Sequence, residues 1–278
     1  MPYAVADVEL TCGLPEIVLG QGQDGFALLV RRRGRPIAFL LREHPPGAPV
    51  DLAGLLAEET GLLVLREALA EELAGGTPVP ATRHVIAAAP GAVLDPGWER
   101  ALAEALVEQP DAAVVAGPAV PRTLADPQAV AAERALPDRF DKLRIAPRHA
   151  AEAPELKVLR VLAAAGAVAV RPDVGPPRRP ADAIAGALRA GLPVAYEPGL
   201  LARTPGGGGD ARAAARERGA ATVALLAALA QGRPALRPHT RRRAARWFAR
   251  EARRAVLIAD ARPLARAELA GALAPRSR

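Results

Sequence analysis

The sequence predicts an α/β fold: a sheet with helices on its faces, preceded by a β-rich segment and followed by a basic helical segment. Strand and helix patterns alternate from residue 84 to residue 230, which is the order expected of such a sheet. Before that region, two apolar runs flank a glycine-containing turn in FALLVRRRGRPIAFLLRE (26–43), which predicts a hairpin. After it, nine arginines fall between residues 233 and 254.

The individual elements follow from hydrophobic periodicity and from helix start and stop signals. Residues 3–42 have β-type alternation, and leucines at helical spacing predict a helix over 51–74. Short buried-type runs predict strands further along, and amphipathic runs predict helices. We expect strands at 84–90, 112–120, the end of 158–170 and 194–196; helices at 98–107, 125–135, 181–190, about 211–230 and about 240–259; an irregular stretch at 137–154; and a flexible break at 204–211.

The composition of the 278 residues supports a sizeable buried core. Half of the residues are hydrophobic, which excludes global disorder, and only 3% are aromatic, so Ala, Leu and Val must build the core. We expect three parts: a β-rich extension over 1–50, an α/β domain over 51–230 and a basic helical segment over 231–278.

The chain has one cysteine, Cys12, which excludes an internal disulfide and fits a reducing compartment. The N-terminus lacks the pattern of a signal peptide, and no apolar window approaches the ~20 residues that span a bilayer. We therefore expect a cytoplasmic protein, with peripheral attachment to a membrane as a further option.

The net charge of +7 comes almost entirely from arginine. One explanation is a coding bias toward Arg, and the other is attraction to an anionic partner such as a nucleotide sugar or a phospholipid face. The segment 233–254 also contains Trp247 and Phe248. It fits a surface helix that attracts anionic lipid or nucleotide phosphate, or a solvated basic face with Trp247 docked on the domain. Nucleic acid is the least favoured partner.

Three stretches occur in an informative order: AVLDPGWERALAEALVEQPDAAVVAGPAVP (92–121), RAGLPVAYEP (189–198) and RAELAGAL (266–273). Together they resemble family 2 glycosyltransferases of the GT-A fold that carry an N-terminal β-rich extension. The resemblance implies a mostly parallel sheet and transfer of a sugar from a nucleotide donor to an acceptor hydroxyl. Only about 30 residues (51–80) separate the extension from the donor strand, which is roughly one βαβ unit. The resemblance therefore implies a truncated fold that lacks much of the nucleotide-binding half.

The resemblance implies substrate-binding positions at Asp95 and Trp98 on the donor side, and at Tyr196 and Glu197 on the acceptor side. Two of these residues have alternative roles. Asp95 stands at a helix start, where it fits an N-terminal cap, and Trp98 fits an anchor in the core.

The resemblance also implies a catalytic role for Asp182, which remains from an acidic pair and would act as the general base. Its alternative role is to balance the dipole in the first turn of a helix. Arg203 falls where the family places a His, and it could pair with phosphate in place of a metal. A divalent metal is expected for the family, but residues 89–91, where its acidic triplet should fall, contain no carboxylate. We predict no metal ligand and no other cofactor.

These features lead to one expectation and two alternatives. We expect a glycosyltransferase-like protein with weak or no turnover, of the hexosyltransferase type if active. The alternatives are a non-catalytic relative that acts as a binding or scaffold protein, and a basic module that binds a membrane surface. Loss of the metal clamp favours weak turnover, because that clamp stabilises the charge of the leaving nucleoside diphosphate.

Overall fold

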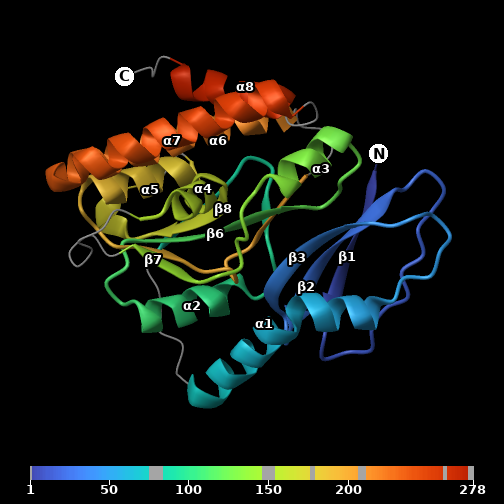
Figure 1. Ribbon diagram of the computed structural model, residues 1–278. Helices are drawn as coiled ribbons and strands as arrows, with labels where there is room; N and C mark the ends of the chain where they lie inside the picture. The colour runs from blue at the N-terminus through green and yellow to red at the C-terminus, as the bar shows by residue number, and fades with distance from the viewer. Residues whose placement is uncertain are drawn as a thin grey trace.

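The computed structural model describes residues 2–74, 84–145, 154–175, 179–205, 211–258 and 262–274. In these residues the chain forms a mixed α/β structure built around two sheets (Figure 1). In chain order the elements are β1 (Tyr3–Glu9), β2 (Gly25–Arg32), β3 (Arg35–Glu43), α1 (Leu52–Ala74), β4 (Val85–Ala88), β5 (Val93–Leu94), α2 (Trp98–Glu108), β6 (Val114–Pro121), α3 (Pro127–Arg134), β7 (Leu143–Ile145), α4 (Leu156–Ala163), β8 (Ala165–Val170), a 3₁₀ turn (Pro172–Val174), α5 (Pro180–Arg189), β9 (Val194–Tyr196), β10 (Ala202–Thr204), α6 (Ala211–Gly232), a second 3₁₀ turn (Pro234–Leu236), α7 (Arg237–Leu257) and α8 (Arg262–Leu273).

The N-terminal sheet has three strands in the order β1-β2-β3. β2 and β3 form the hairpin that the sequence predicts, and β1 lies parallel to β2. The turn residues Arg33 and Gly34 have φ values of 51° and 78°. Positive φ at both turn positions matches the right-handed twist of the flanking strands. The prediction of a β-rich N-terminal extension is therefore confirmed.

The larger sheet has seven strands, with β4, β8 and β6 side by side. On the other side of β6, β9 pairs with its first half and β10 with its second half, and both pairs are parallel. β7 then joins β9, and β5 joins β10. Apart from the β6–β9 and β6–β10 pairs, all the strand pairs of this sheet are antiparallel in the described residues. The prediction of a mostly parallel sheet is therefore wrong. The reason is that the chain leaves β6 and enters β8 at the same end of the strands, so β8 runs antiparallel to β6.

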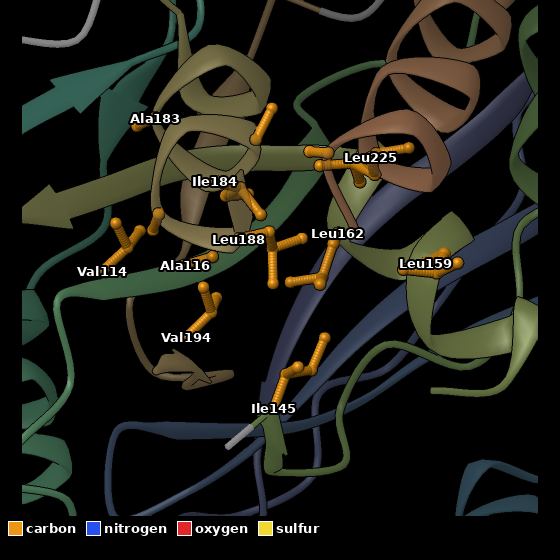
Figure 2. Packing of buried hydrophobic residues seen from close by; sticks show 14 of the residues in the cluster. Val114, Ala116, Ile145, Leu159, Leu162, Ala183, Ile184, Leu188, Val194 and Leu225 are labelled. Carbon is orange, nitrogen blue, oxygen red and sulfur yellow. The ribbon is translucent and has the colours of Figure 1, made fainter. Parts of the chain in front are cut away.

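Helices cover both faces of this larger sheet, as the alternation along β6 requires. Val114 and Ala116 belong to a cluster under α4, α5 and α6, and Figure 2 shows Ile184 and Leu188 of α5 in that cluster. Val115, on the other face, packs with residues of α2. The predicted α/β layers are confirmed in this coarse form.

The two sheets share an apolar contact through β2, which is buried on both faces. Phe26 and Leu28 pack in a cluster with residues of α1. Leu29 points to the other side and packs with Val120 of β6 and Leu201. The apolar run 26–30 is thus a central strand that joins the N-terminal sheet to the larger sheet.

The C-terminal helices α7 and α8 form a layer with α6 (Figure 1). The side chain of Trp247 in α7 is fully buried and lies edge-on to Phe248, with ring centroids 4.9 Å apart. The prediction of a docked Trp247 is therefore confirmed. Among the described residues, no helix combines the length and apolar character that crossing a bilayer needs. The expected flexible break lies largely at 206–210, outside the described residues.

Glycines set the spacing between α6 and α8. A Cβ atom added at Gly219 would stand 1.9 Å from the carbonyl oxygen of Glu268. We predict that Gly219→Ala lowers the free energy of unfolding by about 1–3 kcal/mol, because the helices must separate. Urea unfolding followed by circular dichroism measures it.

Gly186 in α5 provides the matched control, because an added Cβ there meets no atom within 4 Å. Gly186→Ala should stabilise the protein by about 0.5–1 kcal/mol through helix propensity. Equal effects of the two substitutions would contradict the close α6–α8 contact.

Candidate functional site

Two of the sequence stretches that carry the resemblance lie against each other beside the second half of β6. The backbone N–H of Asp95 donates to the carbonyl of Leu201 at 2.9 Å. A Cβ atom added at Gly199 would stand 2.5 Å from the Cβ of Ala101, so the two segments approach more closely than a larger residue permits. Asp95-Pro96-Gly97-Trp98 and Tyr196-Glu197-Pro198-Gly199 are therefore neighbours in space.

A network of four charges, three of them buried or half-buried and the fourth the exposed Asp7, joins these segments to the N-terminal sheet. Asp95 accepts from Arg31 Nη1 at 2.7 Å through one carboxylate oxygen and from Arg203 Nε at 3.1 Å through the other. Asp7 of β1 accepts from Arg203 Nη2 at 2.6 Å and from Arg31 Nε at 3.3 Å. The side chain of Asp95 is only 7% exposed. Asp95 and Arg203 therefore lie together, and their ion pairs with Arg31 and Asp7 join the two sheets.

The interpretation of Asp95 as the cap of α2 is wrong. The cap position is Gly97, with φ of 88°, and no side chain makes a capping hydrogen bond there. Asp95 instead begins a turn in which the Trp98 N–H donates to its carbonyl at 3.3 Å. Its carboxylate points to the two arginines because a buried charge needs charged partners more than a helix end needs a cap.

Glu197 is a buried carboxylate that holds an arginine. Its Oε1 accepts from the Gly199 N–H at 2.9 Å and from Arg35 Nη2 at 3.2 Å, and Lys142 Nζ lies 3.4 Å from its Oε2. Burial raises the pKa of Glu197, and the charges of Arg35 and Lys142 oppose that shift. With a side chain 2% exposed, Glu197 positions Arg35 and is itself shielded from solvent.

A cleft of about 250 Å³ opens between the hairpin tip and the start of α2. It is lined by residues 32–36, by Pro96 and Gly97, by the first two turns of α2 and by Gly199. The lining includes four arginines and a single carboxylate, that of Glu104. The cleft is therefore positively charged.

The start of α2 adds to this positive charge. The first N–H groups of a helix have no acceptors within the helix, and the helix dipole favours anions at this end. Arg100 Nη2 donates to the Arg33 carbonyl at 3.2 Å, which ties α2 to the hairpin tip. Arg35 Nη1 lies 3.7 Å from Glu104. Guanidinium groups beside a helix N-terminus suit a phosphate or a carboxylate.

Glu9 of β1 fixes the hairpin tip that forms one wall of the cleft. Its carboxylate accepts from the N–H of Arg33 at 2.9 Å, from the N–H of Gly34 at 2.7 Å and from the N–H of Thr11 at 3.0 Å. Burial alone would raise the pKa of Glu9, but the hydrogen bonds from Thr11, Gly34 and Arg33 outweigh it and lower the pKa to about 2. The turn at Arg33 and Gly34 is thus held by an ionised carboxylate.

The structure places the remaining predicted residues away from the cleft. Trp98 is half-buried against the α2 face of the sheet, as the anchor interpretation expected. Tyr196 is 2% exposed on the opposite face, among α4, α5 and α6, and burial raises the pKa of its hydroxyl. Asp182 is exposed in the first turn of α5, which covers that same opposite face. The sheet separates Asp182 from the cleft.

The residues near the cleft do not fit a divalent metal. Mg²⁺ and Ca²⁺ require several oxygen ligands, and carboxylates are the usual ones. Both oxygens of Asp95 are held by Arg31 and Arg203. Within the described ranges, no group of three or more His, Cys, Asp or Glu side chains is placed to hold a metal ion.

Sequence reasoning missed the residues that form the cleft and the ion-pair network on the N-terminal side. Arg33 and Arg35 of the hairpin line the cleft, and Arg31 of β2 and Asp7 of β1 belong to the network. The signal was the run of arginines around Gly34, at a turn where exposed charges are common. Nothing local shows that this turn packs against α2.

Comparison of the chain with protein-family models, with curated proteins and with solved structures finds no match. The resemblance to family 2 glycosyltransferases therefore stays a prediction that rests on its three sequence stretches.

Asp95 supplies a first prediction for this site. Asp95→Ala should lower the free energy of unfolding by about 3–5 kcal/mol, because Arg31 and Arg203 then lose a buried partner. Urea unfolding at neutral pH measures the change. In the control, Asp173→Ala removes the exposed pair with Arg171 and should leave the unfolding midpoint close to that of the parent. Equal midpoints for both variants would show that Asp95 does not join the sheets.

Glu9 supplies a second prediction, which concerns pH. The pKa of Glu9 is about 2 in the folded protein, below the ordinary value of 4.5, so the folded state favours the ionised form. Its stabilising contribution is complete above pH 4.5 and is lost as the pH falls toward 2. Glu9→Gln should reduce stability at neutral pH and make the acid decline shallower between these values.

Thermal unfolding across that pH range measures the difference between parent and variant. Glu58→Gln removes the same charge from an exposed position on α1 and serves as the control. A parent and a Glu9→Gln variant with parallel pH curves would contradict the role of Glu9 at the hairpin tip.

Proposed function

We propose that this protein is a glycosyltransferase-like binding protein that holds a phosphate-bearing ligand in the cleft between the hairpin tip and α2, with weak or no sugar transfer. The ligand class is a nucleoside diphosphate or a nucleotide sugar, bound through its diphosphate. The class of ligand comes from the sequence resemblance, and the place of binding comes from the charges of the cleft.

One observation carries the proposal. The two stretches that resemble the donor and acceptor sides of the family, around Asp95 and around Glu197, are far apart in the sequence and meet at one positively charged cleft. Chance similarity in either stretch gives no reason for the two to adjoin. Four arginines and a helix N-terminus in that place favour a di- or trianion.

The surroundings of the three candidate carboxylates, Asp95, Glu197 and Asp182, support weak turnover. Asp95 and Glu197 are buried and paired with arginines, so neither carboxylate is placed to contact an acceptor hydroxyl in the cleft. Asp182, the predicted general base, lies on α5 across the sheet from the cleft. Charge neutralisation by arginines alone binds a diphosphate but supplies no base.

The size of the cleft supports binding through part of a ligand. Sites that enclose a drug-sized molecule have volumes of roughly 300–1,000 Å³. The cleft, at about 250 Å³, is below that range. It accommodates a diphosphate, while a nucleoside or a sugar attached to it would extend into solvent. Such binding favours a modest affinity that depends on salt, because the contacts are ionic.

We predict that calorimetry detects binding of a nucleoside diphosphate without added manganese, and that Arg33→Ala/Arg100→Ala weakens it at least about tenfold, or ~1.4 kcal/mol. The control variant, Arg253→Ala/Arg266→Ala, removes the same charge from exposed positions on α7 and α8. It should bind nearly as well as the parent. Pyrophosphate should compete with the nucleoside diphosphate, because both use the same phosphate contacts.

Two outcomes would contradict this proposal. If no diphosphate compound releases or absorbs heat, the cleft is not an anion site. If binding needs manganese and a nucleotide sugar yields a free nucleoside diphosphate faster than it hydrolyses alone, the protein is an active transferase. A coupled assay for released nucleoside diphosphate distinguishes that second outcome.

A further inference from the structure

A second basic hollow lies on the opposite side of the sheet, between the start of α4 and the start of α7. This groove has a volume of about 500 Å³ and is lined by Glu155, Leu156 and Lys157 from the α4 side and by His239, Arg242, Arg243 and Arg246 of α7. None of these residues lines the first cleft. The groove is thus a separate feature of the molecule.

The α7 residues of the groove share one face of the helix. His239, Arg242, Arg243 and Arg246 stand at positions i, i+3, i+4 and i+7, which is the spacing of a single helical face. Trp247 and Glu251 are buried on the adjoining face of α7. The cationic side chains are therefore directed together, toward α4, by the same packing that docks Trp247.

These cations differ from the arginines that join the two sheets. Arg31 and Arg203 each lie within ion-pair distance of carboxylates. For Arg242, Arg246 and Lys157, no carboxylate lies within ion-pair distance among the residues that the structure describes. Like charges held together repel each other, and an anion between them relieves that repulsion.

The start of α4 adds a further positive element. Glu155 occupies its cap position and makes no side-chain hydrogen bond to the helix end. The first N–H groups of α4 are thus without a capping side chain, and Lys157 stands in the same turn. Side-chain cations on α7 and helix N–H groups on α4 face one hollow.

We infer that this groove is a second anion site, which binds a ligand with two or more phosphate groups. The number of cations and the volume exceed what a single phosphate needs. Two sources supply such chemistry: a soluble polyphosphate compound, or the phosphorylated headgroup of a membrane lipid. No Trp, Tyr or Phe side chain, on which single-stranded nucleic acid stacks, lines the groove, and Trp247 is fully buried.

The site is tested with tripolyphosphate as the soluble probe, in calorimetry on the full chain at low ionic strength. In an Arg33→Ala/Arg100→Ala background, which removes two arginines of the first cleft, Arg242→Gln/Arg246→Gln should weaken the binding at least about tenfold. Arg253→Gln/Arg266→Gln removes the same charge outside the groove and should stay within about twofold of the parent. Circular dichroism confirms that each variant is folded, as expected for exposed positions.

Vesicles separate the two sources. Phosphatidylcholine vesicles with and without phosphatidic acid are pelleted with each variant. A lipid source predicts pelleting only with phosphatidic acid, its loss in Arg242→Gln/Arg246→Gln and competition by tripolyphosphate. If the ligand is a soluble polyphosphate, the parent binds tripolyphosphate, and little of it pellets with either kind of vesicle. Either result supports the groove as an anion site.

Three results would overturn the inference. The first is that the parent binds no tripolyphosphate. The second is that the two variants lose affinity equally, which indicates diffuse attraction to net charge. The third is that a duplex oligonucleotide binds the parent and that both variants lose this binding equally. The variants of the first cleft, Arg33→Ala/Arg100→Ala, should leave the groove's binding intact. Failure of one site is thus distinguishable from failure of the other.

Discussion

The ion-paired carboxylate of Asp95 is the contact on which the rest of the structure depends. It lies between Arg31 of the N-terminal sheet and Arg203 of the larger sheet, and Asp7 completes a set of two positive and two negative charges. A buried charge without a partner costs several kcal/mol, so Asp95, Arg31 and Arg203 must meet for the sheets to close, and the exposed Asp7 pairs with both arginines. Their meeting places the hairpin tip against the start of α2. The cleft exists because these four side chains hold its two walls together.

The same contact limits the chemistry of the site. A buried carboxylate whose two oxygens are both held by arginines has no free oxygen for a metal. Glu197 is in a similar position, since its oxygens are occupied by Arg35, Lys142 and the Gly199 N–H. The acidic residues at this edge therefore organise arginines, and Arg35 lines the cleft. Such an arrangement is suited to holding a diphosphate and poorly suited to activating a hydroxyl.

Periodicity was enough to predict the long elements, since α1, α2, α6 and α7 and the β2–β3 hairpin occur close to their predicted positions. β7 and β10 were not predicted, because each has an arginine in the middle of three residues and forms a strand through pairing with its neighbours in the sheet. The antiparallel direction of β8 was missed for a similar reason, because it depends on the end of the sheet at which the preceding segment brings the chain back. Of the predicted site residues, Asp95, Glu197 and Arg203 lie in neighbouring segments, as the resemblance implied. The period of a strand already sets Tyr196 on the face opposite to Glu197.

Arginine content alone does not distinguish a coding bias from a binding surface, but placement does. Arginines that arose from composition alone would be scattered over the surface or matched with carboxylates. Those at the junction of the sheets are matched, and they fix the geometry of the fold. Those of α7 at Arg242 and Arg246 share one helical face, line a hollow and have no carboxylate within ion-pair distance among the described residues. The positive charge that described carboxylates leave unpaired in a hollow therefore includes Arg242 and Arg246 of α7, away from the residues that the family resemblance singles out.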